Sequence, residues 1–126
     1  MKIEQNQVRE FMRKAGQECP SEPTVPLRDV QTLRLTLIRE ELCELDEAMR
    51  HDDIFETADA IGDLLVVVLG TAVACGIDIQ PVWDEIHRSN MSKFIDGYRR
   101  EDGKWMKGQS YSPANLAPII ESQINK

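Results

Sequence analysis

The sequence predicts an all-α protein, a helical bundle of about four core helices with a short C-terminal tail, completed by oligomerisation. Of its 126 residues, 41% are hydrophobic but only 6% are aromatic, which is typical of helices packed through aliphatic side chains. Apolar residues recur every three or four positions over several long stretches. The prolines fall outside these stretches or in their first turns, where a helix tolerates them.

The length and charge of the chain narrow the classes of function. A chain of 126 residues is expected to form one domain, with a core over about residues 27–95 and a tail over 96–126. A net charge of −7 argues against sequence-independent binding to nucleic acid polymers. The apolar run Leu64–Gly76 falls short of the ~20 residues of a membrane span, and we expect no membrane partner. With no signal-peptide pattern and no paired cysteine motif, we expect a cytoplasmic protein.

The first two helices follow from apolar spacing and from the prolines between them. The first is expected over residues 3–15, with Gly16 as its C-terminal cap, and a proline-rich loop follows over residues 19–26. The second is expected over residues 27–50. Its main apolar stripe, which we expect to face the core, consists of Leu35, Ile38, Leu42, Leu45 and Met49.

A second stripe on the same helix begins with apolar residues and continues with two acidic ones. It begins with Val30, Leu33 and Leu37, and the same spacing then reaches Glu41, Glu44 and Ala48. Two carboxylates therefore stand where the pattern predicts core residues.

The third helix is expected to follow a short turn at residues 51–53 and to end near Cys75. Its core stripe is predicted to be Ile54, Ala58, Ile61, Leu65, Val68, Ala72 and Cys75. Because its C-terminal half is apolar on nearly every side, we expect a partner subunit to cover part of it. The expected assembly is a homodimer or a dimer of dimers.

The remaining elements are shorter. A fourth helix is expected over residues 80–94, with Pro81 in its first turn. Residues 98–101 and 104–107 are expected to pair as a hairpin around the turn at Asp102-Gly103. One short helix is expected after Pro113 or Pro118.

Acidic residues are concentrated on the second and third helices. Glu40, Glu41 and Glu44 lie on one helix, and Glu56, Asp59 and Asp63 on the next, at spacings that let each group share a face. In an antiparallel pair centred near Asp52, Glu41 is level with Asp63 and Glu44 with Ala60. Four or five carboxylates therefore converge. Oxygen ligands without His or Cys favour Mg²⁺, with Mn²⁺ as a substitute, over zinc.

Other interpretations of single acidic residues stay open at this point. Asp53 and Glu56 have the spacing of a helix-start cap, so Glu56 has a capping role as its alternative. Glu40 has a solvated surface position as its alternative.

The order of these motifs resembles that of the all-α NTP pyrophosphohydrolases, which include MazG-like proteins, phosphoribosyl-ATP pyrophosphohydrolases and dimeric dUTPases. The resemblance rests on EE-x-x-E at residues 40–44, DAIGDLL at 59–65, and the stretches GIDIQPVWDEIHRSNMSK and RREDGKWMKG that follow. It covers residues 30–112. It implies a Mg²⁺-dependent domain that hydrolyses a nucleoside triphosphate to the monophosphate and pyrophosphate, with a role in cleaning the nucleotide pool.

The resemblance also implies roles for particular residues. Glu40 is the expected general base, although exchanging Glu40 and Glu41 fits equally well. Asn90 and Lys93 are the expected phosphate contacts, with a cap and a solvated lysine as their alternatives, and Lys104 and Lys107 are weaker candidates in the tail. The expected metal ligands are Glu41, Glu44, Asp59 and Asp63, with Glu56 as a further candidate.

One position departs from the MazG-like pattern. The family has Glu three residues before the aspartate that corresponds to Asp63, and Ala60 stands there. Either neighbouring Asp59 or the Glu56-x-x-Asp59 pair supplies the missing ligand. Two other functions stay open: phosphoribosyl-ATP hydrolysis on the same site, and a non-catalytic helical dimer that binds nucleotides or a protein partner. Ala60 is the best support for the second of these. Aromatic candidates for stacking on a base are Trp83, Tyr98 and Trp105, with Trp83 expected more in the core.

Overall fold

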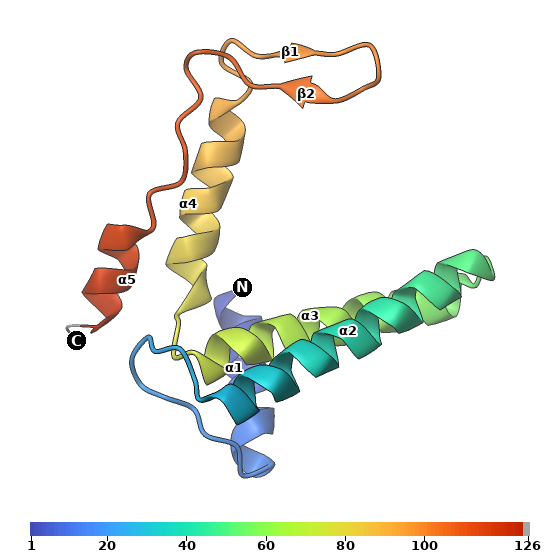
Figure 1. Ribbon diagram of the computed structural model, residues 1–126, viewed down its shortest axis with the longest axis vertical. Helices are drawn as coiled ribbons and strands as arrows, with labels where there is room; N and C mark the ends of the chain where they lie inside the picture. Colours follow the sequence, from blue (N-terminus) through green and yellow to red (C-terminus); the bar gives the residue numbers. More distant parts are fainter. Residues whose placement is uncertain (125–126) are drawn as a thin grey trace. The chain divides into compact units, whose positions relative to one another are not determined.

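The computed structural model describes residues 1–124 as two compact units, Met1–Asp78 and a second unit that starts at Ile79 (Figure 1). The first holds three helices: α1 (Lys2–Lys14), α2 (Arg28–Arg50) and α3 (Ile54–Ala74). The second holds α4 (Ile79–Ser92), β1 (Tyr98–Arg99), β2 (Trp105–Met106) and α5 (Ala117–Ile124). The all-α class is confirmed, and every expected helix lies within a few residues of its predicted bounds.

The turn between α2 and α3 sets how these two helices face each other. Asp52 has a φ of 51°, a left-handed conformation that Asp tolerates better than most residues. The carboxylate of Asp53 then accepts hydrogen bonds from the backbone N–H groups of Phe55 and Glu56, each at 3.1 Å. This N-cap starts α3 immediately after the turn, so the two long helices run antiparallel side by side (Figure 1).

The seam between α2 and α3 differs from the predicted core. Ala48, Ala60 and Gly70 are buried there, together with the charged Arg34. The predicted core stripes were wrong for the single chain, because Leu42 on α2 and Leu65 on α3 remain 54% and 48% exposed. Small residues let two helices approach closely, and that close approach leaves the larger apolar side chains on the outward faces. Leu35, Met49, Ile54, Ile61 and Val68 are exposed in the same way.

α1 and the loop after it pack against the C-terminal half of α3. Val8 and Met12 are buried on α1, as are Leu69 and Val73 on α3. The backbone N–H of Thr24 donates to the carbonyl of Cys75 at 2.8 Å, which ties the proline-rich loop to the end of α3. These contacts hold the loop close to the first turns of α2.

The second unit contains the predicted hairpin. β1 and β2 pair antiparallel, with Tyr98 opposite Met106 and Arg99 opposite Trp105. The indole N–H of Trp105 donates to the carbonyl of Lys93 at 2.7 Å, and its ring lies 4.9 Å from that of Phe94. A side chain at Gly97 would collide with the carbonyl of Lys93, so glycine allows the chain to fold back here.

One helix of the described residues, α3, is long and apolar enough to span a membrane by length and composition alone. Its first half carries Glu56, Asp59 and Asp63, and α2 packs along it. α3 therefore packs against both α1 and α2 within the first unit.

Candidate metal centre

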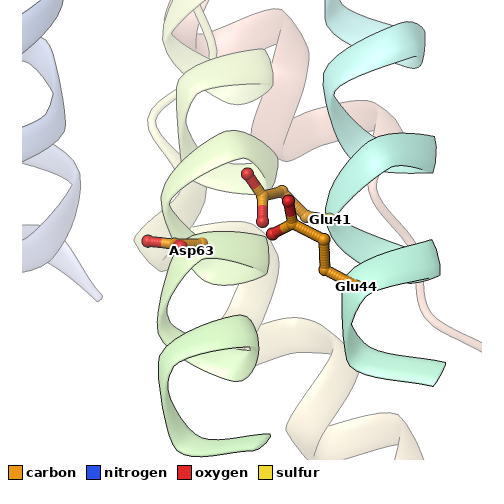
Figure 2. A group of neighbouring side chains, drawn as sticks. All are labelled: Glu41, Glu44 and Asp63. Carbon is orange, nitrogen blue, oxygen red and sulfur yellow. The ribbon is translucent and has the colours of Figure 1, made fainter. Parts of the chain in front are cut away.

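Three carboxylates meet in the seam between α2 and α3. Glu41, Glu44 and Asp63 each offer an oxygen, and these oxygens lie within 4.8 Å of one another (Figure 2). Two of the side chains come from consecutive turns of α2, and the third comes from α3. Glu41 and Asp63 therefore meet as the antiparallel register predicts. Of the six acidic residues in the two predicted groups, these three form the acidic triad.

The triad carries more negative charge than its surroundings compensate. Oε2 of Glu41 is buried and has no hydrogen-bond partner among the described residues. The pKa of Glu41 is raised, first by burial, then by a hydrogen bond with Glu44 and by the charges of Glu44, Asp63 and Asp59. A buried carboxylate oxygen without a donor is costly unless a cation compensates it. The donor set and its charge fit a hard divalent cation.

Asp59 and Glu56 lie beside the triad rather than in it. With Glu44 they line a cavity of about 500 Å³ near the turn between α2 and α3. Among the described residues the cap at the start of α3 is made by the side chain of Asp53 and not by that of Glu56. Glu56 therefore lines this cavity beside Asp59 and does not cap α3.

Ala60 and Glu40 differ in burial and in their position relative to the acidic residues. Ala60 is 3% exposed and lines the same cavity as Asp59, so the position where the MazG-like pattern has Glu does face the acidic site. Glu40 is exposed on α2 and is outside the triad.

The predicted phosphate contacts all belong to the second unit. The ammonium groups of Lys93 and Lys107 lie 5.8 and 4.5 Å from the ring centre of the same tyrosine, Tyr111. Asn90 is exposed and lies inside the last turn of α4, so it is not the residue that caps this helix. Lys104 is exposed at the turn of the hairpin, where its backbone N–H donates to Asp102 at 3.1 Å.

The aromatic residues have different surroundings from those expected. Trp83, expected in the core, is 54% exposed, and Tyr98 is also exposed. Trp105 is half-buried by Phe94 and by its bond to Lys93, so it supports the hairpin.

Sequence reasoning did not single out Arg34. This arginine is 6% exposed and donates to the carbonyl of Val67 at 3.0 Å and to the hydroxyl of Thr71 at 3.4 Å. It stands seven residues, or about two helical turns, before Glu41 and therefore shares its helix face. That spacing is the one signal in the sequence that could have pointed to Arg34.

Comparison with known proteins identifies the family. Residues 8–90 match the family model described as phosphoribosyl-ATP pyrophosphohydrolase, which covers more than half of the chain and includes the whole triad. The chain belongs to the phosphoribosyl-ATP pyrophosphohydrolase family. This family lies within the MazG-like all-α superfamily, so the resemblance seen in the sequence is confirmed. Membership indicates a pyrophosphohydrolase, a hydrolase that acts on acid anhydrides, and suggests a divalent cation.

A curated relative is also similar to part of the chain. An uncharacterized protein of Acanthamoeba polyphaga mimivirus is 38% identical over 69 residues, which cover 52% of this chain and 27% of that protein. The chain thus spans about a quarter of the length of the relative it matches.

Proposed function

We propose that this protein is a Mg²⁺-dependent nucleoside triphosphate pyrophosphohydrolase of the cytoplasm that cleans the nucleotide pool. It hydrolyses a ribo- or deoxynucleoside triphosphate to the monophosphate and pyrophosphate. The observation that carries the proposal is the buried, unpartnered oxygen of Glu41 inside a cluster of three carboxylates. Such a cluster is costly on its own, and a divalent cation that also binds triphosphate compensates it.

The proposed roles follow from where each side chain lies. Glu41, Glu44 and Asp63 hold the cation, and Asp59 and Glu56 supply further oxygens from the adjoining cavity. Mn²⁺ is expected to replace Mg²⁺, because both prefer oxygen ligands. When bound, the cation neutralises phosphate charge and polarises the attacked phosphorus.

Other residues are proposed to accept the proton of the attacking water and to bind the phosphates. Exposed Glu40 accepts a proton from the water that attacks the α-phosphorus, while the bond to the β-phosphate breaks and pyrophosphate leaves. Asn90, Lys93, Lys104 and Lys107 are proposed to donate hydrogen bonds to the phosphates.

A second candidate function is phosphoribosyl-ATP hydrolysis. The description of the matching family model favours it, and it uses the same triad on a different substrate. Ala60 favours a third candidate, a helical dimer that binds nucleotide or a partner without turnover.

Pyrophosphate release from a panel of ribo- and deoxynucleoside triphosphates, with phosphoribosyl-ATP and dUTP included, tests the proposal. We expect release with Mg²⁺ or Mn²⁺ and none with EDTA. The preferred substrate separates the first two candidates. If no substrate releases pyrophosphate while the protein still binds Mn²⁺, the enzymatic proposal is wrong and the third candidate replaces it.

We also propose that the chain forms a homodimer or a dimer of dimers. The exposed apolar residues of α2 and α3 would be covered by a second copy, and covering them removes apolar surface from water. Light scattering coupled to size-exclusion chromatography should give at least twice the 14.4 kDa of one chain. A monomeric mass at micromolar concentration would contradict this assembly.

A further inference from the structure

Arg34 is a buried cation without a carboxylate partner. The surface pairs between carboxylates and Lys14, Arg50, Arg88 or Arg100 do not include Arg34, and no carboxylate of the described residues pairs with it. A guanidinium has five N–H groups, and two of them donate to Thr71 and Val67, which leaves three without a partner among the described residues. Burial lowers the pKa of Arg34 from its ordinary value, and an electrostatic interaction with Cys75 offsets part of this effect. A buried guanidinium with unused N–H groups favours a ligand that accepts hydrogen bonds.

The opposite helix makes room for this side chain. A β-carbon at Gly70 on α3 would collide with a terminal nitrogen of the Arg34 guanidinium. Glycine at position 70 therefore lets the guanidinium cross the seam and reach the carbonyl of Val67 on α3. This close fit makes Arg34 an ordered donor rather than a mobile surface charge.

Arg34 lines a pocket within the first unit. The pocket has a volume of about 430 Å³, within the range of small-molecule sites. Its walls are mainly apolar and come from α1, the proline-rich loop, α2 and α3: Met12, Pro20, Val25, Pro26, Leu33 and Ala74. Of the described residues that line it, Arg34 is the one cation, and the exposed Glu18 and Asp29 are the acids.

We propose that this pocket binds the nucleobase of the substrate, and that it selects bases that carry a carbonyl oxygen. The proposal rests on the proposed nucleotide pyrophosphohydrolase function. Apolar walls receive the faces of the ring, and the free N–H groups of Arg34 donate to the carbonyl. Exposed Glu18 and Asp29 accept hydrogen bonds from the sugar hydroxyls, and their charge disfavours a phosphate in this pocket.

The distance between Arg34 and the acidic triad is short enough for one nucleotide to reach both. Arg34 and Glu41 share a face of α2 and are seven residues apart, or about 10 Å along the helix axis. A nucleoside triphosphate can extend over that distance, with its phosphates at the triad and its base beside Arg34. Adenine presents an amino donor next to its ring acceptor, whereas guanine presents two adjacent acceptors that suit an arginine. Guanine, uracil, thymine and cytosine nucleotides are therefore preferred over adenine nucleotides.

Calorimetry with non-hydrolysable α,β-methylene triphosphates in Mg²⁺ tests this pocket. In the unsubstituted protein, the guanine and uracil compounds should bind about 10-fold or more tightly than the adenine compound, which is the effect of one good contact to a base. Arg34→Met should remove this difference and leave the affinity for inorganic tripolyphosphate unchanged. Arg28→Met is the matched control, because Arg28 is exposed on the same helix and does not line the pocket.

Each outcome separates the base pocket from the proposed function. Equal affinity of the unsubstituted protein for all bases overturns the base pocket, and this result does not depend on whether Arg34→Met folds. A folded Arg34→Met protein with a changed melting temperature but the original base preference shows a structural arginine and also overturns it. Retained tripolyphosphate binding in these cases leaves the proposed function in place. Failure of the unsubstituted protein to bind tripolyphosphate in Mg²⁺ counts against the proposed function itself.

Discussion

A Glu41→Gln protein should be more resistant to heat than the unsubstituted protein in metal-free buffer at pH 7, yet inactive. Its melting temperature should no longer rise when Mg²⁺ is added, and pyrophosphate release should fall by about 100-fold or more, because cation binding supplies several kcal/mol to such reactions. Glutamine fills the same space without the charge that the buried oxygen of Glu41 carries among Glu44 and Asp63.

The direction of the stability change follows from the pKa of Glu41. The folded protein raises this pKa, so the ionised side chain destabilises the fold at any pH above the raised value. The penalty shrinks as the pH falls through the folded pKa and is absent below the unfolded value of about 4.3. In metal-free buffer the unsubstituted protein should therefore gain stability from Glu41 on acidification, and Glu41→Gln should lack this contribution.

Thermal melts at several pH values, with and without Mg²⁺, measure these effects beside an assay of pyrophosphate release. Asp46→Asn is the matched control, because Asp46 is an exposed carboxylate of α2 that pairs with Arg50 at the surface, where such pairs contribute little. A Glu41→Gln protein that Mg²⁺ still stabilises, and that releases pyrophosphate at the normal rate, would show that the triad is not the metal centre.

Glu40→Gln should also lose activity, but it should keep the response to Mg²⁺ that Glu41→Gln loses. Turnover should fall by about 10²–10⁴-fold, the usual contribution of a general base. The rise in melting temperature with Mg²⁺ should persist, because Glu40 is exposed and lies outside the triad. Single-turnover rates together with melts in Mg²⁺ separate the two quantities.

The same pair of measurements decides between Glu40 and Glu41 as the base. If their roles are exchanged, Glu40→Gln abolishes the effect of Mg²⁺ on the melting temperature, and Glu41→Gln retains it. A Glu40→Gln protein with normal turnover and a normal response to Mg²⁺ would remove Glu40 from the mechanism.

Local signals in the sequence were sufficient for the elements and for the centre of the site. Helical periodicity and the prolines place the helices, and the Asp102-Gly103 turn places the hairpin. The short turn before α3 also determines which residues of α2 and α3 are level, so the meeting of Glu41 with Asp63 could be predicted. These features depend on neighbours in the chain, and the sequence therefore contains them directly.

The tertiary structure alone decided which face of each long helix is buried. The larger apolar stripes predicted the faces that contain Leu42 and Leu65, whereas α2 and α3 meet through Ala48, Ala60 and Gly70. Hydrophobic periodicity ranks faces by apolar content, but close packing of two helices depends on side-chain size and shape. For the same reason a buried arginine could not be predicted, because Arg34 is accommodated by the missing side chain of a glycine on another helix.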